Sequence, residues 1–436
     1  MKKKALWGLV AVVCCSACGA PSLRYKHEVN NLVTQGKFDQ AAGLVESKAR
    51  KMYGKRDGLL YALDRGTLLH DAQQPAQSDA LFAVAQQQIT DSYTKSISAS
   101  GARLLINDLT TPYYASYYEI ALTFFYRAIN FLQLNDISAA AVEARKAVFF
   151  LDHLRGSTQK GYNDDPFVQY VSSIIFESSG DLSDARIARE NALNAYRKRG
   201  WATPFFDVPS NAQEYGEVIV FHYVGQVPLK KSQTIQVAWN DIWAFASTPV
   251  ENEGPVSPEL QNALYAGLTG SAITVAYPVL EPQSYLVESS TVDISGLRIP
   301  LQKMSDIAEL AKQDLEMKLP GIWFRLATRA VLKRIAAVQA RHAVQSSSDS
   351  PYNDSLGQLA ELFISILGAA TERADTRQWF TLPAQVYMTR VFVTPGKQNI
   401  RLLLQAKNGS IIGEHTFANV EVPAGGRVFL HHRSGL

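Results

Sequence analysis

Residues 118–152 read YEIALTFFYRAINFLQLNDISAAAVEARKAVFFLD. In its first part, apolar side chains recur at steps of four and three, which places them on one face of a helix, at Phe124, Ala128 and Phe131. The polar pair Asn135-Asp136 interrupts the pattern, as a turn between helices does. The second part repeats the spacing with small residues, which let two helices approach closely, at Ala140, Ala144, Ala147, Val148 and Leu151. This stretch therefore predicts a helical hairpin.

The hairpin pattern recurs on both sides of this stretch. Equivalent positions, separated by 37, 62 and 45 residues, are Val29, Gly66, Ala128 and Ser173. Tetratricopeptide repeats (TPR) have a period of about 34 residues, and the four units resemble them if insertions lie at 98–117 and 155–165. We therefore predict an N-terminal α-solenoid of about four TPR-like helical hairpins over residues 28–200. An irregular helical bundle is the alternative.

The N-terminus has the features of a secretory signal. Three lysines at 2–4 precede an apolar run over 5–13 that is too short to span a bilayer. The following Cys15-Ser16-Ala17-Cys18 resembles a bacterial lipobox, although Cys15 stands where Leu is usual. This resemblance implies a signal peptide over 1–17, an N-acyl S-diacylglycerol lipid on Cys18 and a tether over 18–27. Gly19, in place of Asp, favours the outer membrane; an ordinary signal or an uncleaved anchor helix is the alternative.

Cleavage before Cys18 changes the charge balance. The removed segment carries three lysines and no acid, so 43 Lys and Arg become 40, against 40 Asp and Glu. A chain with no net charge gives no electrostatic reason to expect nucleic-acid binding. The three cysteines all lie between positions 14 and 18, so the mature chain is expected to form no disulfide. We expect no cofactor other than the covalent lipid.

The pattern changes after residue 200. A linker containing two prolines is expected over 201–215, followed by a C-terminal α+β domain over 216–436. Predicted strands lie at 217–224, 273–277, 285–294, 385–393, 398–406, 411–420 and 427–431. Asn408-Gly409 between apolar runs is a strong hairpin signal, so the sheet should be largely antiparallel. Between the strands we predict helices at 305–319, 322–344 and 356–372.

A repeat stack presents a concave groove lined by its first helices. In the register above, the groove carries Leu122, Phe125, Ile129, Gln133, Phe167, Tyr170 and Ile174. These residues are the candidate site for another envelope protein. The alternative is that they pack under the C-terminal domain. Phe124 and Phe131 are expected to be internal.

Three stretches of the second half stand out: EVIVF at 217–221 with GQVPLKK at 225–231, the helix through Arg325, Arg329 and Lys333, and TERADTRQW at 371–379. Together they resemble an uncharacterised family of bacterial TPR lipoproteins. The family has no established reaction, so the resemblance implies a fold and a cellular location but no mechanism. Within the last stretch, a candidate patch for a charged partner comprises Glu372, Arg373, Asp375 and Arg377. Mutual pairing of these charges is the alternative.

Four tyrosines, at 113, 114, 117 and 118, precede the third hairpin. Their rigid, amphipathic rings could bind sugar or peptide at low entropic cost, or could wedge the insertion against the helices. Both interpretations stay open at this point.

The sequence contains no recognised catalytic motif. There is no G-x-S-x-G, H-E-x-x-H, P-loop or dinucleotide fingerprint. His431 and His432 are adjacent on a predicted strand, where neighbours face opposite sides, so they should not ligate one metal. We predict a non-enzymatic outer-membrane lipoprotein that faces the periplasm and acts as a protein-binding scaffold or assembly factor. The alternative is an envelope hydrolase or a glycan-binding component of a polysaccharide pathway.

Overall fold

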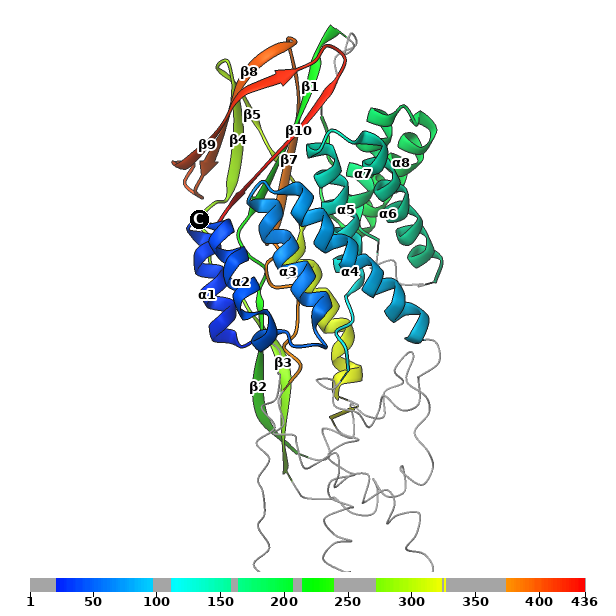
Figure 1. Ribbon diagram of the computed structural model, residues 1–436, viewed down its shortest axis with the longest axis vertical. Coiled ribbons are helices and arrows are strands. Elements are labelled where there is room, and N and C mark those ends of the chain that lie inside the picture. The colour runs from blue at the N-terminus through cyan, green and yellow to red at the C-terminus, as the bar shows by residue number, and fades with distance from the viewer. Residues whose placement is uncertain are drawn as a thin grey trace, which may run out of the picture.

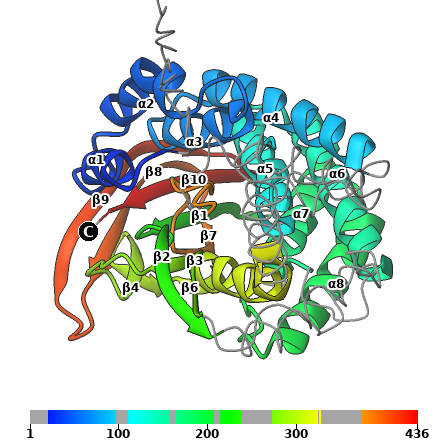
Figure 2. The same ribbon diagram turned by 90° about the horizontal axis from the view of Figure 1, so that it is seen from below.

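The computed structural model describes residues 21–96, 111–157, 164–206, 214–238, 272–323, 325–326 and 374–435. Within these residues the protein is mixed α+β. A curved row of helices encloses one face of a sheet, and a second sheet covers the opposite face (Figures 1 and 2). Helices and first sheet share a single apolar cluster. The two halves of the chain are therefore joined by a common core.

The helical half is a row in which each helix packs on the next. Its members are α1 (Leu23–Thr34), α2 (Phe38–Met52), α3 (Gly58–Asp71), α4 (Pro75–Ser96), α5 (Tyr117–Gln133), α6 (Ile137–Ser157), α7 (Pro166–Ser179) and α8 (Leu182–Arg199). The turn inside each pair contains a residue with positive φ, at Gly36, Gln73, Asn135 and Gly180. These turns lie 37, 62 and 45 residues apart, which agrees with the predicted hairpin register.

The strands form two four-stranded sheets and a ribbon. They are β1 (Gly216–Val224), β2 (Leu229–Ala238), β3 (Ala272–Glu281), β4 (Ser289–Ile294), β5 (Leu297–Pro300), β6 (Gln302–Asp306), β7 (Gln385–Val393), β8 (Gly396–Gln405), β9 (Ile411–Val422) and β10 (Arg427–Ser434). The first sheet has the order β10-β1-β7-β6 and the second the order β5-β4-β8-β9, while β2 pairs with β3. All pairings are antiparallel except β1 with β10, which is parallel.

Strand β1 is buried on both faces along its whole length. Phe221 and Tyr223 belong to the cluster shared with the helices, whereas Val218 and Val220 belong to a second cluster with the β4 and β8 sheet. Successive side chains of a strand point to opposite faces. The first sheet is therefore the middle layer of three.

An extended segment over 374–384 runs through the interior between the helices and the first sheet. Asp64 on α3 accepts hydrogen bonds from the backbone N–H of Phe380 (3.2 Å) and Thr381 (3.3 Å) and from the Tyr53 hydroxyl (2.9 Å). The Trp379 ring nitrogen donates to Thr67 Oγ1 (2.8 Å). Burial raises the pKa of the Asp64 carboxyl to about 7. These bonds satisfy backbone groups that no strand partner covers.

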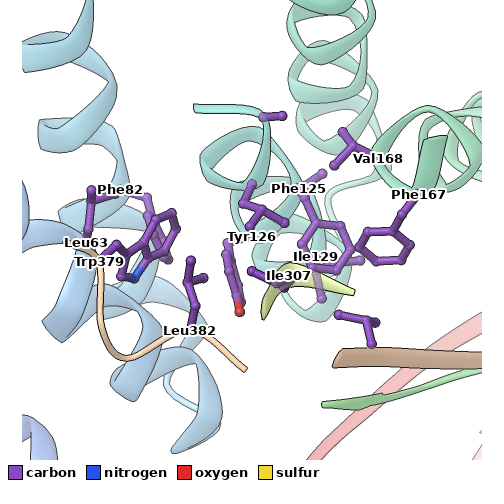
Figure 3. Packing of buried hydrophobic residues seen from close by; sticks show 14 of the residues in the cluster. Leu63, Phe82, Phe125, Tyr126, Ile129, Phe167, Val168, Ile307, Trp379 and Leu382 are labelled. Carbon is purple, nitrogen blue, oxygen red and sulfur yellow. The ribbon is translucent and has the colours of Figure 1, made fainter. Parts of the chain in front are cut away.

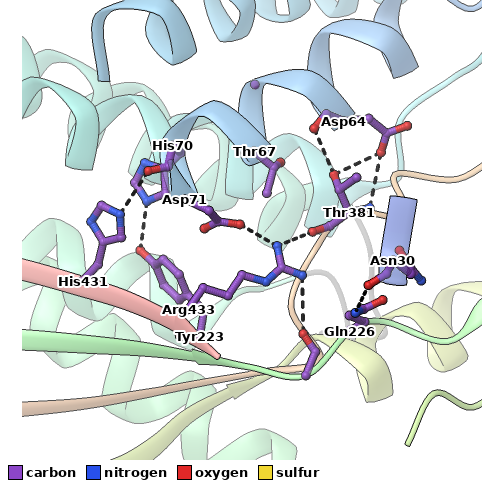
Figure 4. A network of polar contacts seen from close by, with 12 residues as sticks. Asn30, Asp64, Thr67, His70, Asp71, Tyr223, Gln226, Thr381, His431 and Arg433 are labelled. Carbon is purple, nitrogen blue, oxygen red and sulfur yellow. Dashed lines mark hydrogen bonds and ion pairs between the residues drawn. The ribbon is translucent and has the colours of Figure 1, made fainter. Parts of the chain in front are cut away.

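A second set of buried polar contacts joins α3 to the first sheet (Figure 4). Arg433 on β10 donates to Asp71 Oδ2 (2.7 Å), and both side chains have no exposed surface. His70 donates from Nδ1 to Asn130 Oδ1 (2.7 Å) and accepts at Nε2 from the Tyr223 hydroxyl (3.4 Å). Burial lowers the pKa of His70 to about 4, so the ring is neutral. The helices are thus fixed to the sheet by directional contacts as well as by apolar packing.

Several predicted boundaries are wrong, among them that of the strand predicted over 285–294, which begins only at Ser289. The tether predicted over 18–27 ends earlier, because α1 begins at Leu23 and the Ser22 hydroxyl accepts a hydrogen bond from the Tyr25 N–H (3.3 Å). The helix predicted to stop before Pro320-Gly321 runs without interruption over 307–323. Of the linker predicted over 201–215, residues 201–206 contain neither helix nor strand, and β1 begins at Gly216. The helix predicted over 356–372 lies outside the described residues.

Candidate functional site

The predicted partner groove is filled by the protein's own sheet. Leu122, Phe125, Ile129, Phe167, Tyr170 and Ile174 are each at most 5% exposed. The Phe125 ring lies 5.9 Å from Phe221 and 6.4 Å from Tyr223, both on β1, and Phe167 lies 6.4 Å from Phe221. Figure 3 shows Phe125 and Phe167 side by side within the buried cluster. The prediction that these side chains receive another protein is wrong, because β1 already occupies their side of the helices.

Gln133, the seventh groove residue, is half-buried at the end of α5. Its amide nitrogen lies 2.8 Å from His431 Nδ1 on β10 and 3.3 Å from Gln73 Oε1. Phe124 and Phe131, expected to be internal, are only partly buried. Phe124 contacts Phe150 of α6, while the Arg127 guanidinium lies over Phe131. The sheet-facing side of α5 is thus its more deeply buried side.

The described members of the predicted charged patch, Asp375 and Arg377, pair with each other instead of forming a recognition surface. Arg377 is 4% exposed and donates to Asp375 Oδ2 (2.7 Å), to Asp57 Oδ1 (2.9 Å) and to the Thr111 carbonyl (2.7 Å). The Arg377 guanidinium holds the pKa of Asp375 below its usual value, although burial opposes this shift. Its other predicted members, Glu372 and Arg373, lie outside the described residues. The described half of the patch is an internal ion-pair cluster.

The four tyrosines divide into two pairs with different surroundings. Tyr113 is buried and donates to Glu119 Oε2 (2.6 Å), and burial raises the pKa of Tyr118 well above its usual value. Tyr114 and Tyr117 are 42% and 38% exposed and line a cavity of about 290 Å³. One pair wedges the chain against the helices, and the other is presented to a ligand-sized space.

This cavity, called here the tyrosine pocket, lies between α3, α4, the start of α5 and the helix at 307–323. It is lined by Leu59, Ile89, Ser92, Tyr114, Ala115, Ser116, Tyr117, Ile120, Asp314 and Lys318. Most of its wall is therefore apolar or aromatic. Its polar groups gather where the N-terminus of α5 meets the helix at 307–323.

Three side chains form the polar end of the tyrosine pocket. Lys318 Nζ donates to Ser116 Oγ (2.7 Å) and to Asp314 Oδ2 (2.8 Å), and Ser116 Oγ donates to the same carboxylate (2.9 Å). Asp314 and Lys318 are one turn apart on their helix, which brings both to one face. Ser116 is the N-cap of α5 and forms a capping box with Glu119. The Lys318 side chain is 47% exposed, so its ammonium group can reach a ligand.

Ser116 and Lys318 can be compared with a catalytic Ser–Lys pair. A serine hydroxyl 2.7 Å from a lysine amine is the spacing of a Ser–Lys nucleophilic pair. Such a pair needs its amine free to act as the base, but the Lys318 amine also donates to Asp314 Oδ2 (2.8 Å). In addition, the Ser116 hydroxyl is engaged in helix capping. The group can donate hydrogen bonds to a ligand in the tyrosine pocket and accept hydrogen bonds from it.

Sequence reasoning identified the tyrosines but missed the polar end of the pocket. Two local signals were present: an acid and a base four residues apart within the predicted helix at 305–319, and the Ser116-x-x-Glu119 capping pattern. Neither signal indicates that α5 packs against the helix at 307–323. Ser116 and Asp314 are 198 residues apart.

His431 and His432 lie on opposite sides of the first sheet, as predicted. His431 stacks on His70 of α3 with ring centroids 4.1 Å apart, and His432 stacks on His415 of β9 at the same separation. Within the described parts of the chain, no group of three or more His, Cys, Asp or Glu residues is placed to hold a metal ion. No helix among the described residues has the length and apolar character required to cross a bilayer.

No protein-family model matches the chain, and no curated protein matches it at a significant level. Cys18 and the rest of residues 1–20 lie outside the described residues.

Proposed function

We propose that this protein is an outer-membrane lipoprotein, anchored by an acylated Cys18 and facing the periplasm, that binds an envelope glycan in the tyrosine pocket as a non-enzymatic accessory factor. The anchor assignment is supported by the charged and apolar signal followed by Ser16-Ala17-Cys18. The helical half is a TPR-like α-solenoid in this proposal, supported by four consecutive hairpins with matching turns. The concave side of the helical half packs against the first sheet of the same chain, so we place the ligand at the helix ends.

One observation supports a sugar as the ligand. Two half-exposed tyrosine rings, at 114 and 117, line the same cavity as Ser116, Asp314 and Lys318. Aromatic rings present an apolar face and a hydroxyl tip, which suits the C–H face and hydroxyl edge of a sugar. The polar end supplies both donors and acceptors, as sugar hydroxyls require. The Ser116 N–H already donates to the Glu119 carboxylate (2.7 Å), which leaves one backbone donor fewer for a peptide.

The anchor is tested by replacing its thiol. Because only Cys18 is expected to accept the diacylglyceryl group, Cys18→Ser should abolish metabolic labelling with a radioactive fatty acid and leave an unprocessed precursor. The control is Cys15→Ser, which keeps the acceptor thiol and should retain labelling. Normal labelling of Cys18→Ser would overturn the anchor assignment.

The tyrosine pocket is tested with a panel of oligosaccharides on an array, followed by calorimetry with the best binder. Tyr114→Ala and Tyr117→Ala should each weaken binding by about 1 kcal/mol, roughly fivefold, as expected for loss of one aromatic contact. Lys318→Met should weaken it further by removing a charged donor. The control, Phe149→Ala, changes a 77% exposed ring on α6 outside this pocket. Unchanged affinity in all pocket variants would show that the glycan binds elsewhere.

A further inference from the structure

The start of the fold lies very close to the proposed lipid. Ser22 is already the N-cap of α1, so only Gly19, Ala20 and Pro21 separate it from Cys18. Four extended steps of the chain reach at most about 14 Å. An acylated Cys18 would therefore keep the first turn of α1 within about 14 Å of the bilayer surface, but this tether alone would not fix the orientation of the protein.

The same end of the molecule carries a group of exposed cations, called here the basic end. It comprises Arg24, Arg50, Lys51, Lys55 and Arg56, all exposed. Arg24 is in the first turn of α1, and the other four lie in the last turn of α2 and the turn that follows. The two regions are adjacent, because the rings of Tyr25 and Tyr53 are in edge contact with centroids 6.2 Å apart.

The acidic residues nearby do not neutralise this group. Asp57 is buried and paired with Arg377, and Glu46 pairs with Arg65 of α3. Glu28, one turn further along α1, is exposed. Within the described part of the chain, none of the five cations of the basic end forms an ion pair with any of these carboxylates. The basic end thus keeps a net positive charge, although the mature chain as a whole is balanced.

We propose that the basic end docks on the anionic headgroups of the membrane that holds the lipid anchor, and so fixes the orientation of the whole protein. This inference rests on the proposed acylation of Cys18. Each Lys or Arg near an anionic bilayer strengthens association by roughly fivefold, and five of them lie beside the anchor. The opposite end of α1, with Lys37 in its turn, then points away from the bilayer.

The test uses the full lipidated protein, with acylation first verified from the mass of its N-terminal peptide. All three cysteines of the sequence lie at or before Cys18, so an introduced cysteine is the only free thiol. Fluorophores are attached at Ala49→Cys, near the basic end, and at Gln35→Cys, at the other end of α1. The proteins are reconstituted in vesicles of phosphatidylcholine with or without phosphatidylglycerol, each containing a lipid with a quencher on its headgroup.

We expect quenching at position 49, not at 35, in the anionic vesicles. This quenching should be lost in neutral vesicles, at high salt, which screens exposed charges, and in Lys51→Glu/Lys55→Glu. The charge-matched control Lys37→Glu/Lys407→Glu should retain it. Equal quenching at 49 and 35, or quenching at 49 that is indifferent to lipid charge and to Lys51→Glu/Lys55→Glu, would overturn the proposal. An unacylated N-terminal peptide would instead contradict the proposed anchor, so the two failures are distinct.

Discussion

Helix α5 contributes to two regions with opposite character. On its inner side, Phe125 and Ile129 are buried against the first sheet, and at its N-terminus Ser116 and Tyr117 line the tyrosine pocket. On the inner side, the residues that a repeat protein would use to bind a partner are instead packed against the protein's own sheet. The N-terminus keeps the Tyr117 ring 38% exposed beside the hydrogen-bonded group of Ser116, Asp314 and Lys318. This difference is the basis of the proposal that the protein binds its ligand at the helix ends and not on the inner side of the helices.

The largest effect is expected where the interior is charged. Asp71→Ala leaves Arg433 buried without its counter-charge, and loss of one partner of such a pair costs about 3 to 5 kcal/mol. Urea denaturation at pH 8, where Asp71 is ionised, measures the change. Asp184→Ala, on the exposed side of α8, is the control and should change stability by no more than about 0.5 kcal/mol. Similar values for both variants would contradict the interior role of the pair.

Phe125 tests whether the groove is core or binding surface. Phe125→Ala should lower the free energy of unfolding by about 3 kcal/mol, because it removes a ring packed against Phe167, Phe221 and Tyr223. The matched control is Phe149→Ala on α6, whose ring is 77% exposed and whose loss should change stability by no more than about 0.5 kcal/mol. If Phe125→Ala kept wild-type stability, the sheet would not occupy the groove in solution.

The smallest effect is a pH dependence on the far face of the sheet. Burial, with weaker contributions from His415 and His431, lowers the pKa of His432 to about 3, whereas an unfolded histidine titrates near 6.5. Between these values the unfolded chain binds a proton that the native chain does not, so stability falls as the pH falls, by about 1.4 kcal/mol per pH unit. His432→Gln should remove this contribution. Denaturation curves at pH 6.5 and pH 5 for the wild type and the variant measure this contribution. An equal change in unfolding free energy between the two pH values in both proteins would contradict the assignment.

Local patterns in the sequence predicted much of the fold. The turn at Asn135-Asp136 and the spacing of small residues in α6 specify a hairpin without reference to distant residues. The strands at 385–393 and 411–420 were predicted for the same reason, since alternation and the Asn408-Gly409 turn are local. The helix at 307–323 continues through Pro320 because a single missing N–H does not outweigh the surrounding helical bonds.

The occupant of the groove and the site itself could not be predicted in this way. The pattern in α5 shows that Phe125 lies on one face, but a β-strand of the same chain and a foreign segment satisfy that face equally well. The choice depends on Phe221, 96 positions away in the sequence, and on β10 pairing parallel to β1. The tyrosine pocket likewise requires Ser116 and Lys318 to meet across 202 residues. Contacts at such separations leave no periodic signal in either segment.

The parallel pairing of β10 with β1 has a consequence for biosynthesis. Arg433 and His431 on β10 complete contacts with α3, yet they are made more than 360 residues after it. During synthesis, α1 to α8 therefore emerge with the aromatic face of Phe125 and Phe167 uncovered, since β1, which contacts it, and the strands that pair with β1 are made later. Contacts between such distant segments form slowly, and exposed apolar surface promotes aggregation in the meantime. The sheet that covers this face is therefore complete only once β7 and β10 have been made.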